Sequence, residues 1–379
     1  MSSDPSPALP IAVTPSAHPR AAAERQAVLA DPGFGRVFTD HMVRIPWDAD
    51  RGWHDAQLVP YGPIPLDPAT MALHYGQEIF EGLKAYRQPS GAIATFRPYE
   101  NARRFARSAA RLAMPALDEE TFVAALTALV TQDAAWVSPE EEKSLYLRPF
   151  MFATEAGLGV KPAHSFLFLV IASPAGAYFS GGVRPVSVWL STEYTRAAPG
   201  GTGAAKCAGN YAASLVAQAQ AEQAGCDQVV WLDAVSHRYV EEMGGMNLFF
   251  VRGSGSSARV ETPALTGTLL AGVTRDSLLT LAGDLGHPVA ETRISTEEWE
   301  QGNATGEITE VFACGTAAVI TPVGSVKHAH GTWTVGDGQP GPVTLRLRQA
   351  LLDLQHGQAP DPHRWVHPLV PARGHASTG

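Results

Sequence analysis

Apolar and polar residues follow two different periods along the first half of the chain, which predicts a mixture of helices and strands. Helical spacing of apolar side chains predicts a helix over residues 121–136. A second helix is expected over residues 101–113, with Asn101 as its N-cap and Pro115 as the stop signal beyond it. Strands are predicted at residues 91–97, 144–154 and 165–173.

The second half repeats this mixture after a stretch rich in Gly and Pro at residues 174–185. That stretch lacks any period, so it is interpreted as an interdomain linker. Ser295 and Glu298 form a capping-box pattern that opens a helix, and Pro342 suits the first position of another. Strands are predicted at 186–192, 228–233, 247–252 and 258–262, the last two as a hairpin, and helices at 211–224, 274–285 and 342–355.

A length of 379 residues exceeds the usual size of one hydrophobic core, which favours two domains. We expect a disordered tail at residues 1–25 and a small N-terminal domain at 26–174. A linker at 175–185 then leads to a large domain at 186–358. The last residues, 359–379, are expected to form a loose C-terminal tail.

Composition narrows the class of protein. A net charge of −9 without basic runs argues against nucleic acid as a partner, and no apolar run reaches the length of a membrane span. The N-terminus lacks the features of a signal peptide, and three widely spaced cysteines fit a reducing cytoplasm. No metal site is expected, because the C-terminal histidines lack a regular ligand spacing. The three cysteines are Cys207, Cys226 and Cys314, and the C-terminal histidines are His356, His363, His367 and His375.

A single lysine stands out between a Gly-rich loop, Gly200–Gly203, and an apolar helix. Lys206 is the only lysine between Lys161 and Lys327. Small, uncharged neighbours allow such an amine to be desolvated. The alternative is an ordinary solvated loop lysine. A nucleotide-binding P-loop is excluded, because a cysteine stands where Ser or Thr should hold the metal.

Two adjacent acids, Glu241 and Glu242, lie between two predicted strands. Neighbouring strand residues point to opposite faces, so only one of these carboxylates can face a site. A surface turn is the alternative. Two further segments, residues 270–275 and 314–317, could present backbone N–H groups to a phosphate, although helix entry and a simple turn explain them equally well.

Six runs, in this order, resemble the branched-chain amino acid aminotransferases, which have the fold type IV architecture of pyridoxal-phosphate enzymes. The resemblance covers residues 34–356 and implies a mixed α/β fold, with a smaller N-terminal domain and a larger C-terminal domain around a mixed, barrel-like sheet. The runs are Phe80-Glu-Gly-Leu-Lys-Ala-Tyr86, Leu145-Tyr-Leu-Arg-Pro149, Lys206-x-x-Gly-Asn-Tyr211, Glu241-Glu-Met-Gly-Gly-Met-Asn247, Gly272-Val-Thr-Arg275 and Gly315-Thr-Ala317.

The resemblance assigns roles to individual residues. Lys206 matches the Schiff-base lysine and general acid/base, Glu242 the partner of the pyridine nitrogen, and Tyr211 the neighbour of the phenolic oxygen. The residues matching the phosphate-binding set are Arg104, Val273, Thr274 and Thr316. Those matching the substrate pocket are Tyr75, Phe80, Tyr146, Arg148 and Ala317.

Tyr75 and the loop at residues 158–160 match positions that the neighbouring subunit supplies in this family. The resemblance therefore implies a homodimer with shared active sites. The sequence departs from the pattern of this family at two places. Gly245 stands where some members have Thr, and Ala318 and Thr321 replace a redox pair of cysteines.

The activity implied is a ping-pong transfer of an amino group between L-leucine, L-isoleucine or L-valine and 2-oxoglutarate. Arg148 or Tyr146 is expected to bind the glutamate γ-carboxylate. A D-amino-acid aminotransferase and an aminodeoxychorismate lyase are alternatives with similar residues around the lysine and the acid. A protein that binds the cofactor without catalysis is a third.

Overall fold

The computed structural model describes residues 7–140, 143–176 and 183–372. These residues form two compact units. One consists of the described parts of Met1–Tyr178 and Asp353–Gly379, and the other of the described part of Phe179–Leu352. Residues 177–182 of the expected linker lie outside the described part of the chain, so the linker stays a prediction.

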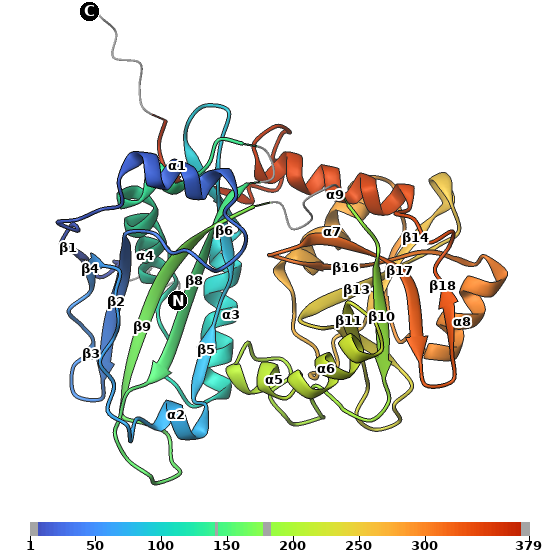
Figure 1. Ribbon diagram of the computed structural model, residues 1–379, viewed down its shortest axis with the longest axis horizontal. Coiled ribbons are helices and arrows are strands. Elements are labelled where there is room, and N and C mark those ends of the chain that lie inside the picture. Colours follow the sequence, from blue (N-terminus) through green and yellow to red (C-terminus); the bar gives the residue numbers. More distant parts are fainter. Residues whose placement is uncertain (1–6, 141–142, 177–182, 373–379) are drawn as a thin grey trace, which may run out of the picture. The chain divides into compact units, whose positions relative to one another are not determined.

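The first unit is built on a ten-stranded, largely antiparallel sheet (Figure 1). Its strand order is β1-β4-β2-β9-β8-β6-β7-β19, with β3 paired to β2 and β5 paired to β8. The strands are β1 (Ala12–Val13), β2 (His41–Asp48), β3 (Gly52–Trp53), β4 (Gln57–Pro60), β5 (Glu78–Phe80), β6 (Leu83–Arg87), β7 (Ile93–Phe96), β8 (Ser144–Ala153), β9 (Ser165–Ala175) and β19 (Val366–Val370).

Helices of this unit pack on the sheet through apolar side chains. Phe105 of α3 and Phe122 of α4 are fully buried and contact Phe168 of β9 with ring centroids 5.5 and 6.0 Å apart. The helical segments are α1 (Ala22–Ala30), α2 (Met71–Tyr75), α3 (Pro98–Arg111), α4 (Glu119–Gln132) and the 3₁₀ turn η1 (Ala134–Trp136).

The predicted start of α3 is wrong. The helix begins at Pro98, because proline suits the first helical turn, where its missing N–H costs nothing. Asn101 therefore lies inside the helix and is buried. The helix ends at Arg111, before the predicted residue 113, and the two long strands β8 and β9 are confirmed.

Within the described residues, parts of both expected tails are ordered, contrary to the prediction. At the N-terminus, β1 pairs in parallel with β4, and α1 starts at Ala22. At the C-terminus, β19 pairs with β7, and Leu369 is buried. The segment 366–370 is short, and a strand that pairs with a partner some 270 positions away leaves no local signal.

The second unit contains a closed barrel of six strands. In the order β12-β11-β10-β17-β16-β13, each strand pairs with the next, and pairing of β13 with β12 completes the ring. β14 and β15 extend the sheet from β13, and β18 pairs with β17. The strands are β10 (Val186–Ser191), β11 (Gln228–Leu232), β12 (Val240–Met243), β13 (Met246–Arg252), β14 (Arg259–Pro263), β15 (Val289–Thr292), β16 (Ile308–Gly315), β17 (Val319–His328) and β18 (Gly331–Thr334).

Alternation along β11 shows how this barrel is stabilised. Val230 and Leu232 belong to one apolar cluster, which includes Trp299, whereas Val229 and Trp231 pack against Ala217 and Ala221 of α6. The helical segments are α5 (Ala208–Ala212), α6 (Leu215–Gln223), η2 (Gly255–Ser257), α7 (Val273–Asp284), α8 (Thr296–Thr305) and α9 (Pro342–Gln355).

The single helix predicted at 211–224 is divided into α5 and α6. The break falls at Ala213 and Ser214, where the Ser214 hydroxyl donates to the Tyr211 carbonyl at 2.6 Å and so competes with a continuous helix. The helices predicted at 274–285 and 342–355 and the hairpin β13–β14 are confirmed. The predicted cap at Ser295 is confirmed too, because its hydroxyl accepts from the Glu298 N–H. The helix predicted at 121–136 ends earlier, at Gln132, and a separate 3₁₀ turn follows it. Among the described residues, no helix combines the length and apolarity needed to cross a membrane.

Candidate active site

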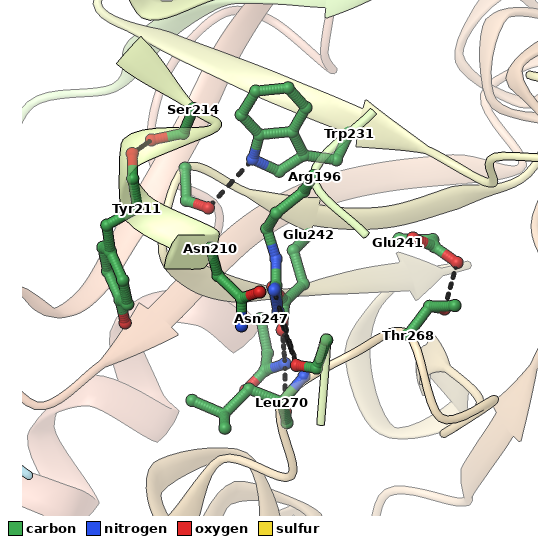
Figure 2. A network of polar contacts seen from close by, with 12 residues as sticks. Arg196, Asn210, Tyr211, Ser214, Trp231, Glu241, Glu242, Asn247, Thr268 and Leu270 are labelled. Atoms are coloured by element: carbon green, nitrogen blue, oxygen red, sulfur yellow. Dashed lines mark hydrogen bonds and ion pairs between the residues drawn. The ribbon is translucent and has the colours of Figure 1, made fainter. Parts of the chain in front are cut away.

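The second unit holds a cavity of about 360 Å³, which is within the range of small-molecule sites. Its walls come from the region around α5, from β12 with the turn that follows it, and from the loop before α7. Several of the lining residues are drawn in Figure 2. The lining consists of Arg196, Ala205, Asn210, Tyr211, Ser214, Gln218, Gln228, Glu242, Gly244, Gly245 and Leu270.

Lys206 stands directly before α5 and donates from Nζ to the Tyr211 hydroxyl at 2.8 Å. Its sequence neighbours, Ala205 and Cys207, are both buried. Asn210 holds the preceding loop in place, because its amide donates to the carbonyls of Thr202 and Ala205, both at 2.9 Å. The partly buried amine does not fit the alternative of a freely solvated loop lysine.

Glu242 on β12 is 3% exposed and accepts three hydrogen bonds. The donors are Arg196 Nε at 2.5 Å, the Leu270 N–H at 2.8 Å and Asn247 Nδ2 at 3.2 Å. Burial raises the pKa of Glu242, while Arg196, the Leu270 N–H and Lys206 act in the opposite direction. The acid is thus desolvated and is held by one cation and two neutral donors.

Glu241 faces away from this cavity, in agreement with the alternation expected along a strand. Its carboxylate accepts from the Thr268 hydroxyl at 2.5 Å and lines a second cavity, as the separate positions in Figure 2 show. Burial is the main cause that raises the pKa of Glu241. Both acids lie on a buried strand, so the alternative of a surface turn is wrong.

The two predicted phosphate segments have the expected local geometry. Val273 and Thr274 form the first turn of α7, whose N-cap is Gly272. A Cβ at Gly272 would lie 2.1 Å from Asn247 Oδ1, so only glycine allows this close approach. Asn247 also donates to the Leu270 carbonyl at 3.0 Å, and therefore connects Glu242 with the entry to the helix.

Thr316 and Ala317 lie in the turn between β16 and β17. The strand pairing runs to Gly315 and Val319, which limits the turn to three residues. Asn247 is paired with Cys314 at the end of β16, next to this turn. Tyr211 and Glu242 thus line one cavity, and Lys206 is hydrogen-bonded to Tyr211 at its edge. The phosphate roles of α7 and of this turn stay predictions.

In the first unit, the structure brings together three residues that were predicted to bind substrate. The Arg148 guanidinium lies over the Phe80 ring at 4.7 Å and over the Tyr146 ring at 5.3 Å, and its Nη2 donates to the Tyr146 hydroxyl at 3.0 Å. A Cβ on Gly82 would lie 2.1 Å from the Tyr146 hydroxyl, so glycine is required beside this cluster.

The remaining predicted residues of the first unit lie in two places. Arg104 is buried on α3 and forms an ion pair with Glu81. The Tyr75 hydroxyl donates to the Leu158 carbonyl at 2.5 Å, so Tyr75 and the loop at 158–160 are in direct contact. Leu158 and Val160 of this loop are 70% and 84% exposed.

Comparison with known proteins places this arrangement in a family. The family profile for amino-transferase class IV matches residues 78–326. A probable branched-chain-amino-acid aminotransferase of Streptomyces coelicolor is 61% identical over 361 residues, which cover 95% of this chain and 99% of that protein. The chain belongs to the branched-chain aminotransferase family of class IV.

Two further matches extend this class IV aminotransferase assignment. The branched-chain-amino-acid aminotransferase of Mycolicibacterium smegmatis is 61% identical over 359 residues, covering 94% of this chain and 98% of that protein. The T.th. branched-chain amino acid aminotransferase has been solved with pyridoxamine 5'-phosphate and with N-(5'-phosphopyridoxyl)-L-glutamate. Both structures are 32% identical, with a TM-score of 0.71, and cover 86% of this chain and 98% of theirs. The predicted fold type IV architecture is confirmed.

Pyridoxal 5'-phosphate is the cofactor of this aminotransferase, and the residues at the cavity fit it. A primary amine, a phenol and a buried carboxylate are the three groups that an aldehyde, a phenolic oxygen and a ring nitrogen require. They are Lys206, Tyr211 and Glu242, and all three lie in one unit.

Arg196 and Asn247 are the residues that sequence reasoning missed in this aminotransferase. Arg196 lies ten positions before Lys206 in an irregular segment, and nothing local marks it as the partner of an acid 46 positions later. Asn247 ends a motif that the resemblance contains, yet its contacts to Glu242 and Leu270 appear only in three dimensions.

Proposed function

We propose that the chain transfers an amino group reversibly between L-leucine, L-isoleucine or L-valine and 2-oxoglutarate. The observation that carries this proposal is a cavity of a class IV aminotransferase that Tyr211 and Glu242 line, with Lys206 hydrogen-bonded to Tyr211. The choice of branched-chain substrates is supported by the names of relatives that are 61% identical to it.

Lys206 is proposed to move the proton at the substrate α-carbon. Its Nζ is 2.8 Å from the Tyr211 hydroxyl, which orients the amine through a hydrogen bond. The bound cofactor supplies an aldehyde carbon that takes the amino group and a ring that accepts the electron pair of the broken C–H bond. Arg104, Val273, Thr274 and Thr316 are proposed to hold the cofactor phosphate.

Glu242 is proposed to keep the ring nitrogen protonated. A carboxylate does this only while it is ionised, and burial opposes ionisation. Arg196, at 2.5 Å, and the N–H of Leu270, at 2.8 Å, favour the charged form. The surroundings of Glu242 are therefore those of an acid that must stay charged inside a low-dielectric site.

Phe80, Tyr146 and Arg148 are proposed to bind the substrate side chain, with Ala317 near the substrate carboxylate. Aromatic rings suit leucine, and a guanidinium suits the γ-carboxylate of glutamate, which would be costly to bury without a partner. The T.th. enzyme has been solved with a glutamate adduct of the cofactor. Arg148→Met should raise KM for L-glutamate far more than KM for L-leucine, whereas equal increases would contradict this role.

A ping-pong order, a homodimer with shared active sites and a cytoplasmic location complete the proposal. The first product would leave before the second 2-oxo acid binds. The homodimer is supported by exposed apolar residues beside Tyr75, at Leu158 and Val160. The cytoplasm is supported by three buried cysteines that form no disulfide.

Half-reaction spectra of the purified holoenzyme test the substrate class. L-leucine and L-glutamate should each convert the cofactor spectrum in the absence of a 2-oxo acid, and D-alanine should not. Turnover of D-alanine without L-leucine would favour the D-amino-acid aminotransferase instead. Borohydride reduction and peptide mapping should place the cofactor on Lys206, and a label on another lysine would overturn the mechanism.

A further inference from the structure

The first unit contains a buried carboxylate to which the proposed mechanism gives no role. Glu81 directly follows β5 and has an exposed fraction of 0%. Its backbone N–H donates to the Pro149 carbonyl at 2.7 Å, which fixes the position of the main chain. A carboxylate at such a position must be compensated, because an isolated buried charge is very costly.

The compensation comes mainly from Arg104. Its Nε donates to Glu81 Oε1 at 2.7 Å and its Nη2 to Oε2 at 2.8 Å, which is the two-pronged geometry of a strong Arg–carboxylate pair. Arg104 is itself only 5% exposed. The pair is therefore desolvated on both sides, unlike the surface pair of Arg103 and Glu100 on the same helix.

Asn101 completes the arrangement from one turn earlier on α3. Its Nδ2 donates to Glu81 Oε2 at 2.8 Å, and the Gly82 N–H donates to the same oxygen at 3.2 Å. Glu81 is thus held by the main chain and by Asn101 independently of Arg104. The carboxylate can therefore act as a fixed reference for the arginine.

A guanidinium is planar and carries five N–H groups in a rigid fork, of which Glu81 binds two. Fixing these two N–H groups fixes the plane of the guanidinium and hence the directions of the other three. An arginine that binds a phosphate depends on those directions, because its recognition of phosphate oxygens is geometric.

We propose that Glu81 is a positioning residue for the cofactor phosphate, which acts by orienting Arg104. The inference rests on the proposed role of Arg104 and adds Glu81 and Asn101 to it. A competing effect has the opposite sign, since the negative charge of Glu81 weakens the attraction of Arg104 for a phosphate dianion. The proposal states that orientation outweighs this loss of charge.

The test compares cofactor binding with and without the phosphate. Apoenzyme is titrated with pyridoxal 5'-phosphate and with pyridoxal. For each variant, the Kd of pyridoxal divided by the Kd of pyridoxal 5'-phosphate gives a ratio that measures the preference for the phosphorylated form. Glu81→Gln should weaken binding of pyridoxal 5'-phosphate by about tenfold, as loss of a supporting partner commonly does, and leave pyridoxal within about twofold. Glu100→Gln, which removes one of the two surface carboxylates paired with Arg103, is the matched control and should leave the ratio unchanged.

Two further variants separate the possible outcomes. Asn101→Ala keeps the ion pair but removes one bond to Glu81, so it should lower the same ratio to a smaller extent and serves if Glu81→Gln does not fold. Arg104→Ala should abolish most of the preference for the phosphorylated form. If it does not, the phosphate role of Arg104 is wrong and the inference fails with it.

If Arg104→Ala lowers the ratio and Glu81→Gln does not, the role of Arg104 stands and only the inference on Glu81 is overturned. Tighter binding of pyridoxal 5'-phosphate by Glu81→Gln would also overturn it, because charge would then outweigh orientation. Equal weakening of both aldehydes, together with a lower Tm, would mean that Glu81 merely stabilises the unit.

Discussion

Arg196 and Glu242 form a buried ion pair in which the two side chains are 8% and 3% exposed. In such a pair, removal of one partner leaves an uncompensated charge, which costs several kcal/mol unless the remaining group changes its protonation state. Glu242 can do so by taking up a proton. The charge of this carboxylate is therefore the property that depends most directly on Arg196.

Arg196→Gln should shift the acid limb of the kcat/KM profile for L-leucine to higher pH. Arg196 is among the groups that lower the pKa of Glu242, so its loss raises that pKa further. Ionisation then requires a higher pH, so we expect the acid limb to move to higher pH. Arg238→Gln, which removes an exposed pair with Glu297, should leave the limb in place. An unchanged acid limb in Arg196→Gln would contradict the coupling.

Gly245 permits the observed position of the Tyr211 ring. A Cβ at residue 245 would lie 3.3 Å from Tyr211 Cε1, which requires a displacement of a few tenths of an ångström. The Tyr211 hydroxyl is hydrogen-bonded to Lys206, so a displaced ring also displaces the amine. Gly245→Ala should therefore lower kcat/KM by roughly two- to tenfold with little change in Tm. Gly283→Ala on α7, which meets no atom within 4 Å, is the control. Full activity of Gly245→Ala would show that the ring tolerates the shift.

The residues that carry the chemistry differ in how far the sequence reveals them. Lys206 is visible because it is isolated among small residues, and alternation on a strand correctly separates Glu242 from Glu241. Their partners are hidden for a physical reason. Arg196 and Glu81 act across 46 and 23 positions of sequence, and only tertiary packing decides which charges meet.

At the scale of single elements, local signals were sufficient where one residue determines the boundary. Ser295 caps α8 and Pro342 opens α9 as predicted. Where two local signals favour different helix boundaries, the predicted boundary was wrong. Asn101 resembles an N-cap, yet Pro98 starts α3 earlier, and Ser214 interrupts a segment whose apolar pattern predicts one helix.

The N-terminus of α9 is capped by a side chain from another element. Glu310 on β16 accepts from the Val343 N–H at 3.1 Å, from the Thr344 N–H at 2.8 Å and from the Thr344 hydroxyl at 2.7 Å. A Cβ on Gly341 would overlap this carboxylate, at 2.0 Å from Glu310 Cδ. Such a cap binds the start of a helix to the barrel and cannot be recognised from the helix sequence.

Glu310→Gln should destabilise the protein by about 2 kcal/mol, because a charged acceptor of three hydrogen bonds is replaced by an amide with one acceptor. For a unit of this size, that corresponds to a fall in Tm of about 5 °C. Ser295→Ala, which removes a local cap with one hydrogen bond, should cost only about 1 kcal/mol. Thermal unfolding of both variants checks the order, and a larger loss in Ser295→Ala would contradict it.

At the scale of the whole molecule, length alone favoured two domains, but the architecture within each unit required more. The ring of the barrel closes through a pairing of β12 with β13, and the order of the other strands is not sequential. No periodicity encodes that order. The barrel was predicted only from the family resemblance. The pairing of β19 with β7 was not predicted, because neither strand carries a signal that identifies its partner.

The proposed sharing of active sites between subunits can be tested by complementation. Tyr75 contacts the loop at 158–160, whose Leu158 and Val160 expose apolar surface that a second subunit could cover. If Tyr75 serves the neighbouring subunit, Tyr75→Ala and Lys206→Ala inactivate different sites of a dimer. Each variant alone should be almost inactive.

Coexpression of the two variants with different tags would yield mixed dimers that have one subunit of each kind. In a mixed dimer, the site with an intact Lys206 receives Tyr75 from the subunit that carries Lys206→Ala, so one of its two sites works. If pairing is random, half of the dimers are mixed, and activity should return to about a quarter of the wild-type value. A dimer in which each subunit uses its own Tyr75 would regain nothing on mixing, because every site would then lack either the tyrosine or the lysine. Purified mixed dimers should reach about half of the wild-type activity, which separates a failure of complementation from a failure of the subunits to associate.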